Sequence, residues 1–441
     1  MRDRKRATPL DHAIQAYPVQ DGTDAHSHFG CVLHLRGTPP DIDGLRRHLE
    51  ERLARLPGLC TVLDARTGRW HTKDPDLALH VQELVVPPGD DALRDAAREV
   101  LRTPLPGDVP PWLMALLRDE ESGRCALVYR VHHAAQDGAG MLHTLEELFS
   151  AEPVAPQESS AVYRKARGVR LSRPGDWLRA GALTLRLLGR SRAWQVPEYR
   201  FSTNRDLDCV AVPADWLNPP DGEGGSRNDV FLAATARAVR EWAAESGAGP
   251  LRRGEVPMLV PANLRTDRDL DLPGNPLVLA PVRVPAPPAG SAAQMRSATR
   301  ALRDPAVRFL LARFGGIMPH RLAALQLRSL GTPSRTMPIV SNLTLRHPLA
   351  VLGAEVVRID PLMCLPRGFP FTVLMITHGG TSVACFVTES ALPGLATLPG
   401  RWRDALDDLR TTGRTTVPNP RTGTGAGAGA GESPDPARAR P

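Results

Sequence analysis

Two adjacent histidines are followed by an aspartate and a glycine in the segment His132-His133-Ala134-Ala135-Gln136-Asp137-Gly138. Histidine suits proton abstraction near neutral pH because its unperturbed pKa is about 6.5. The apolar run before the segment predicts a strand, and successive side chains of a strand point to opposite faces. We therefore expect one of His132 and His133 to be buried as a support and the other to be presented as a general base.

The aspartate and the glycine of this segment have structural roles that the sequence leaves open. Asp137 can cap the N-terminus of the following helix, or it can be buried and paired with an arginine that fixes the loop. Gly138 gives the backbone room to turn without a Cβ atom. A metal centre is not expected, because ligation by adjacent residues is awkward and no further clustered histidine or cysteine accompanies the pair.

The residues around the histidines predict a first lobe of mixed strands and helices. The run Cys125–Val131 predicts the strand that leads into the segment, and Met141–Phe149 predicts the helix that follows it. Upstream, the patterns predict a short helix near residues 9–11, a strand over 28–35, an amphipathic helix over 42–56, a weaker strand at 69–71 and a helix over 91–102.

The second half of the chain predicts another α+β lobe. It opens with a long helix over Asn228–Glu245, and a hairpin turn is expected at residues 377–380. Strands are expected over 256–260, 277–284, 338–343, 354–359, 369–376 and 382–387, and helices over 292–303, 318–329 and 399–410.

Two further segments differ in composition. Residues Trp177–Arg190 predict a basic amphipathic helix, which either lies on a membrane surface or packs across two lobes. The end of the chain, residues 416–441, is built largely from Gly, Ala, Pro and Arg, which cannot bury a core, so we expect disorder there.

The composition argues against several classes of protein. The net charge is +7, but we take the arginines to be spread along the chain and mixed with acids, so no nucleic-acid partner is expected. The six cysteines are scattered without a CxxC pair, which predicts free thiols and a reducing, cytoplasmic location. The N-terminus lacks the apolar region of a secretory signal, and no window approaches the roughly 20 apolar residues that span a bilayer.

The pattern HHxxxDG resembles the signature of the condensation-domain superfamily. This superfamily includes nonribosomal condensation domains, chloramphenicol acetyltransferase relatives and bacterial wax ester synthase/diacylglycerol acyltransferases. Further landmarks resemble the wax ester synthase type and follow in order along the chain: Pro9-Leu10-Asp11, His28-Phe29-Gly30, Leu105-Pro106, Pro110-Pro111-Trp112, Asn228-Asp229-Val230, Pro261-Ala262-Asn263-Leu264-Arg265, Gly274-Asn275 and Ser341-Asn342.

The resemblance implies an α+β fold of two chloramphenicol-acetyltransferase-like lobes in a V-shaped pseudo-dimer, with a tunnel at their junction. We place the N-terminal lobe at 1–155, an inter-lobe linker with the amphipathic helix at 156–205, the C-terminal lobe at 206–415 and a disordered tail at 416–441.

The resemblance also assigns roles to residues of the expected site. His133 would be the general base, with Gly138 and Asn342 beside the reacting atoms. His132 and Asp137 would be structural, Asp137 pairing with Arg265 of the second lobe. Asn342, or Ser341 beside it, would donate a hydrogen bond to the oxyanion.

The implied reaction moves an acyl group from a thioester to a hydroxyl or amine of a small-molecule acceptor. The donor would be acyl-CoA or the phosphopantetheine of an acyl or peptidyl carrier protein, and no bound cofactor or metal is implied. One segment departs from the wax ester synthase pattern, since Leu343–Pro348 replaces a Pro-Gly-rich turn, and the plant motif DFGWG is absent. Three alternatives therefore stay open: an acyltransferase of specialised metabolism, a lipid acyltransferase with weak peripheral membrane contact, and a non-catalytic domain that binds carrier proteins.

Overall fold

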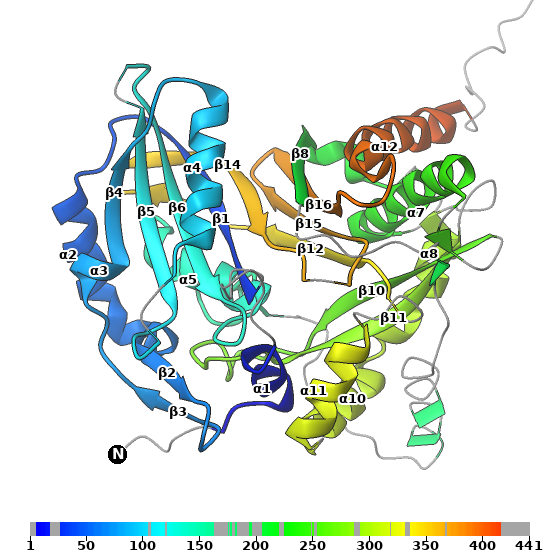
Figure 1. Cartoon of the computed structure of the whole chain (residues 1–441), viewed down its shortest axis with the longest axis horizontal. Helices are drawn as coiled ribbons and strands as arrows, with labels where there is room; N and C mark the ends of the chain where they lie inside the picture. The colour runs from blue at the N-terminus through cyan, green and yellow to red at the C-terminus, as the bar shows by residue number, and fades with distance from the viewer. Residues whose placement is uncertain are drawn as a thin grey trace, which may run out of the picture.

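Two six-stranded sheets, each covered by helices, form two lobes that lie side by side (Figure 1). The predicted fold class, α+β with two lobes, is confirmed. This computed structural model describes residues 6–17, 27–104, 107–119, 121–162, 175, 177–178, 181–182, 194–195, 205–219, 225–247, 249–250, 254–285, 292–317, 319–330, 336–366 and 368–415.

The first sheet has the strand order β13-β14-β1-β6-β5-β4. Its two faces are covered by different helices because alternate side chains of a strand point to opposite sides. Cys31 and Leu33 pack towards α2 and α5, whereas Val32 packs towards α4, and all three are buried. The elements are β1 (His28–Arg36), α2 (Ile42–Arg52), β4 (Val81–Val85), α4 (Asp90–Arg102), β5 (Trp112–Asp119), β6 (Arg124–His132), α5 (Gly138–Phe149), β13 (Ala350–Val351) and β14 (Ala354–Met363).

The second sheet has the strand order β11-β10-β12-β15-β16-β8. Two long helices cover it, and the buried rings of Phe231, Phe386 and Trp402 join them to the sheet. The elements are β8 (Arg205–Pro213), α7 (Arg227–Ser246), β10 (Glu255–Asn263), β11 (Leu277–Pro285), β12 (Ile339–Leu345), β15 (Phe371–His378), β16 (Thr381–Glu389) and α12 (Leu398–Thr415).

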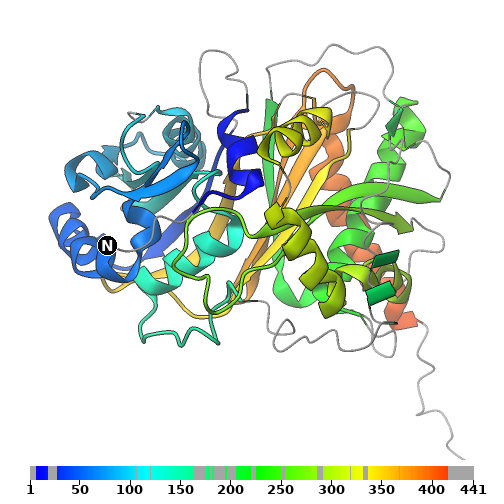
Figure 2. The same cartoon turned by 90° about the horizontal axis from the view of Figure 1, so that it is seen from below.

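Shorter elements complete the two lobes. They are α1 (Pro9–Gln15), β2 (Thr61–Asp64), β3 (Arg69–Thr72), α3 (Leu77–His80), β7 (Trp194–Gln195), β9 (Gly249–Pro250), α8 (Ala292–Ala298), α9 (Arg300–Arg303), α10 (Pro305–Ile317) and α11 (His320–Leu330), with 3-10 turns at Leu53–Arg55, Pro57–Cys60, Ala214–Leu217 and Leu395–Thr397. In Figure 1, α1, α10 and α11 lie together at the lower edge, and Figure 2 views the molecule from that side.

The second half of the chain contributes one segment to the first lobe. Strand β14 comes from the second half of the sequence, yet it pairs with β1 in the first sheet, from Phe29 opposite Met363 to Arg36 opposite Glu355. Residues 350–363 therefore cross from the second lobe into the first. The lobe boundaries drawn from the sequence stay a prediction. Boundaries written as contiguous ranges cannot include a segment that crosses into the other lobe.

Most predicted helices and strands are confirmed within a few residues. The structure also contains elements that were not expected, of which the longest are β5, β8 and α10 and the shorter are β2, α3, β4, β7, β9 and β13. Strand β5 is buried on both faces except at one residue, so its sequence is a continuous apolar run without the alternation that marks a half-buried strand. The helix predicted over 292–303 is interrupted at Thr299 and forms α8 and α9.

Two predictions fall largely outside the described residues. Of the helix expected over 177–190, Trp177, Leu178, Gly181 and Ala182 are described and are helical, and the rest is not. The expected disordered tail, 416–441, also lies outside. Within the described ranges, every helix is too short or too polar to cross a membrane.

The expectation of free thiols is wrong for one pair of cysteines. Cys209 on β8 and Cys385 on β16 form a disulfide across 176 residues of sequence. The two strands are antiparallel, and these residues are directly opposite each other, with Cα atoms 4.0 Å apart. The pairing depends on the strand register, which spacing along the chain could not reveal. The argument for a cytoplasmic location from free thiols therefore no longer holds for this pair.

Candidate active site

The two histidines of the signature take the different positions that strand geometry predicts. Strand β6 ends at His132, and the backbone N–H of His133 donates to Ser27 at 2.7 Å as the chain leaves the sheet. His132 is 5% exposed, and its Nδ1 accepts a hydrogen bond from the Ala134 N–H at 3.1 Å. His133 instead lines the cavity between the lobes. His132 therefore supports the loop that presents His133.

The side chain of His133 is held by an amide from the other lobe. Its Nδ1 lies 2.9 Å from Oδ1 of Asn275. The Nδ2 of Asn275 donates to the Asp11 carboxylate at 2.9 Å and to the His133 carbonyl at 2.6 Å, so the amide oxygen must face the imidazole. An amide oxygen only accepts, and Nδ1 of His133 therefore carries the proton. This leaves Nε2 as the basic nitrogen.

Asp11 anchors this amide. Helix α1 begins with a capping box in which Asp11 and Thr8 exchange hydrogen bonds, at 2.7 and 3.1 Å. The same buried carboxylate accepts from the backbone N–H of Asn275 at 2.8 Å. Burial raises the pKa of Asp11 above its ordinary value, against the hydrogen bonds from Asn275 and Thr8, which lower it. The chain Asp11–Asn275–His133 thus joins three segments far apart in the sequence.

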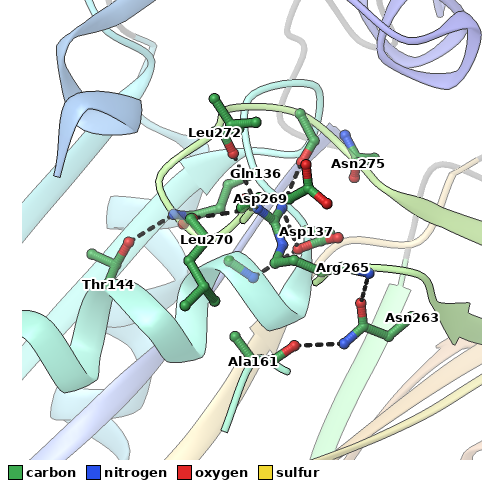
Figure 3. Close-up of polar contacts among 12 residues, drawn as sticks. Gln136, Asp137, Thr144, Ala161, Asn263, Arg265, Asp269, Leu270, Leu272 and Asn275 are labelled. Atoms are coloured by element: carbon green, nitrogen blue, oxygen red, sulfur yellow. Dashed lines mark hydrogen bonds and ion pairs between the residues drawn. The ribbon is translucent and has the colours of Figure 1, made fainter. Parts of the chain in front are cut away.

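Asp137 fills both of the roles that the sequence left open. Its Oδ1 accepts from the Gly140 N–H at 2.7 Å and caps α5, and the same atom lies 3.1 Å from Nη2 of Arg265. Figure 3 shows this ion pair, and both of its side chains are at most 2% exposed. The expected contact between Asp137 and Arg265 is therefore present, and it crosses the junction between the lobes.

Arg265 also organises the loop that carries Asn275. Its Nη1 donates to the carbonyls of Asp269 and Leu272 at 2.6 and 3.1 Å, and its Nη2 donates to Gly274 at 3.0 Å (Figure 3). The loop closes onto the histidine segment where the Gly274 N–H donates to the Ala135 carbonyl at 2.7 Å. One guanidinium therefore fixes the signature aspartate and the loop that positions the partner of His133.

A cavity of about 700 Å³ lies at the junction of the lobes. Strands β10 and β12 pair at Leu259 and Ile339, and residues 260–263 of β10 and 341–344 of β12 line the cavity. Its lining is largely apolar. Of the predicted site residues His133, Asp137, Gly138, Ser341 and Asn342 line the cavity, and His132 and Arg265 lie behind it.

Gly138 lies close against the second lobe. A Cβ atom on this residue would lie 2.8 Å from Cδ1 of Leu343. Leu343 belongs to the segment that departs from the wax ester synthase pattern. Instead of turning, this segment continues β12 to Leu345, and the Arg346 N–H then donates to the Ser160 hydroxyl at 2.9 Å.

Asn342 has an unused hydrogen-bonding atom at the cavity. Its Oδ1 is buried and has no hydrogen-bond partner among the described residues. Such an atom costs free energy unless a bound molecule satisfies it, so the amide is placed to bind a polar group of a ligand.

Sequence reasoning missed the roles of Asn275 and Asp11. Both residues were landmarks of the family resemblance, in Gly274-Asn275 and Pro9-Leu10-Asp11, and that was the available signal. The described residues contain no group of histidine, cysteine and acidic side chains that could hold a metal ion.

Comparison with known proteins supports the resemblance. The family model of the wax ester synthase/diacylglycerol acyltransferase catalytic domain matches residues 18–193. Over 93% of the chain, the fold is that of solved wax ester synthase/diacylglycerol acyltransferase and condensation-domain structures.

Individual relatives are distant. Two proteins of Mycobacterium tuberculosis H37Rv, provisionally named diacylglycerol O-acyltransferases Rv2484c and Rv3740c, are each 28% identical, over 288 and 229 residues. These matches cover 54% and 45% of this chain, and 57% and 50% of the relatives. The chain thus spans about half the length of the curated relatives it matches.

Solved structures show the same fold across nearly the whole chain. The wax ester synthase/diacylglycerol acyltransferase from Marinobacter aquaeolei VT8 is 16% identical, with a TM-score of 0.59, over 93% of this chain and all of its own. The first condensation domain of the calcium-dependent antibiotic synthetase is 19% identical, with a TM-score of 0.66, over 93% of this chain and 96% of its own.

Proposed function

We propose that this protein is an acyltransferase that uses His133 as the general base to move an acyl group from a thioester to a hydroxyl or amine. The observation that carries the proposal is the hydrogen bond from His133 to Asn275, which fixes Nδ1 as the protonated nitrogen. Nε2 is then the base, on a residue that lines an apolar cavity large enough for substrates.

The reaction balances without any further reactant. Nε2 of His133 takes the proton from the acceptor as its oxygen or nitrogen attacks the thioester carbonyl. The new C–O or C–N bond forms, the C–S bond breaks, and the imidazolium returns the proton to the departing thiolate. Asn275 Oδ1 stabilises the imidazolium through Nδ1–H, and the Asn342 amide, turned to present Nδ2, would donate to the oxyanion.

The donor is proposed to be acyl-CoA or an acyl chain on a carrier-protein phosphopantetheine. A starter condensation domain of rhizomide synthetase, 14% identical with a TM-score of 0.60, was solved in complex with C8-CoA. A condensation domain of the calcium-dependent antibiotic synthetase was solved with a substrate analogue. The mainly apolar lining of the cavity suits an acyl chain.

A lipid acceptor fits the comparisons at least as well as a small-molecule acceptor. The matched family model and the names of the Mycobacterium relatives favour a long-chain alcohol or diacylglycerol. A small alcohol or amine of specialised metabolism is the other candidate. The departure at Leu343–Pro348, which the structure shows as strand β12 continuing beside the signature glycine, supports it.

The proposal is tested by intact-mass detection of acyl transfer, with acyl-CoA and acyl-carrier-protein donors offered to four acceptor classes: small amines, small alcohols, a long-chain alcohol and a diacylglycerol. We expect turnover with at least one pair, and His133→Ala to lower it by about a hundredfold to ten-thousandfold. His132→Ala should instead lower thermal stability. Absence of transfer from every donor would favour a non-catalytic domain, and undiminished transfer by His133→Ala would exclude this residue as the base.

A further inference from the structure

The positive charge of the chain is concentrated in two segments. Residues 163–193 contain nine Lys or Arg and one acidic residue, and residues 292–330 contain seven Arg and one acidic residue. The remaining chain has 39 basic and 46 acidic residues, a net charge of −7, although the whole chain is at +7. The expectation that the arginines are mixed with acids along the chain therefore does not hold within these segments.

Helix α11, in the second basic segment, has two opposed apolar faces. Leu327 lines the cavity between the lobes. On the outer side, Leu322 is 52% exposed and Leu325 is 65% exposed, although leucine side chains gain free energy by leaving water. Arg321 and Arg328 are also exposed. Positions 321, 322, 325 and 328 lie on the same face of a helix, so one arginine lies at each end of the two leucines. A single helix thus separates the active-site cavity from a basic, apolar outer face.

The neighbouring helix α10 extends the exposed apolar area. Phe309 is 41% exposed and packs edge-on against Trp177, which is 44% exposed, with ring centroids 6.1 Å apart. Leu178, beside it, is 76% exposed. We call Phe309, Arg321, Leu322, Leu325 and Arg328 the α10–α11 surface.

We propose that the α10–α11 surface binds the surface of an anionic lipid bilayer. Exposed apolar side chains flanked by arginines fit a bilayer interface, because the leucines enter the acyl boundary while the arginines meet lipid phosphates. A nucleic acid would pair with the arginines and leave the leucines in water. The positive charge of this face comes from Arg321 and Arg328, which are both exposed, and Arg328 also donates to the Ala16 carbonyl at 3.2 Å.

The position of α11 connects membrane binding to the active site, and this connection rests on the proposed acyl transfer. The helix lies between the bilayer and the cavity, and it packs on α1, whose Leu10 and Ile14 also line the cavity. An apolar acceptor or donor chain leaving the membrane would meet the cavity after passing one helix. In Figure 2, which views this edge of the molecule, α1 and α11 lie side by side, as their packing requires.

The test is flotation of the full chain with vesicles of phosphatidylcholine, with and without phosphatidylglycerol. We expect binding to the anionic vesicles and weakening by salt. Leu322→Ser/Leu325→Ser and Arg321→Gln/Arg328→Gln should each weaken binding by about tenfold or more. Two matched controls on exposed residues elsewhere, Leu84→Ser/Val85→Ser and Arg66→Gln/Arg403→Gln, should bind as the unchanged chain does.

Three outcomes would overturn the proposal: absence of binding to anionic vesicles, equal loss in the controls, and binding to duplex DNA that depends on the arginines but not on the leucines. Transfer from acyl-CoA to a water-soluble acceptor, measured without vesicles, should be unchanged in both α11 variants. This second readout shows that the variants fold, and it separates failure of membrane binding from failure of acyl transfer.

Discussion

At the scale of single residues, the proposed base depends on groups that the signature does not contain. HHxxxDG supplies the imidazole, the strand end and the cap of α5, but the tautomer of His133 is set by Asn275, and the amide of Asn275 is oriented by Asp11. An acid-anchored amide thus takes the place of a carboxylate beside the histidine. Asp11, which is buried in α1, is 264 residues from its partner.

Asn275→Ala should lower kcat by tenfold or more with little change in KM. A neutral hydrogen bond contributes about 1 kcal/mol. Its loss also allows His133 to carry its proton on Nε2, the tautomer that cannot act as the base. The measurement is the steady-state kinetics of both forms. A rise in KM as large as the fall in kcat would indicate that Asn275 shapes the cavity and does not orient His133.

At the scale of elements, the site is where α5, β12 and the loop after Arg265 meet. Asp137 starts α5 and also binds Arg265, so one carboxylate sets both the helix and the opposing loop. Gly138, the next residue, brings the first turn of α5 against Leu343 of β12. The sequence after Asn342 and the signature glycine are therefore parts of one packing contact.

Gly138→Ala should destabilise the protein by about 1–3 kcal/mol, because the new Cβ overlaps Leu343 Cδ1. Leu343→Ala in the same chain should recover part of this loss, giving a coupling of at least about 0.5 kcal/mol in a double-mutant cycle. The measurement is the free energy of unfolding in urea. Gly107→Ala, where a Cβ meets open space, is the control and should be neutral. Additive losses from the two substitutions would exclude the contact.

At the scale of the whole molecule, the sequence predicts individual helices and strands better than the contacts between distant segments. The helices α4, α5 and α7 and the strand before His132 follow from periodicity, and the resemblance supplies the two lobes and the Asp137–Arg265 contact. The crossing of β14 into the first sheet, the closing of Asn275 onto His133 and the cysteine pairing all depend on strand register and on contacts between distant segments. Periodicity along the chain carries no information on these.

The disulfide between β8 and β16 should stabilise the second lobe. It links an edge strand to its neighbour across 176 residues, and loss of such a link typically costs about 2–4 kcal/mol because the unfolded chain gains freedom. Cys209→Ser/Cys385→Ser should therefore lower the Tm, and a reductant should lower the Tm of the unchanged chain but not that of the double variant. Cys60→Ser, at a free and half-buried thiol, is the control. Alkylation in denaturant without reductant should modify four of the six cysteines, whereas modification of all six would show that the pair is reduced.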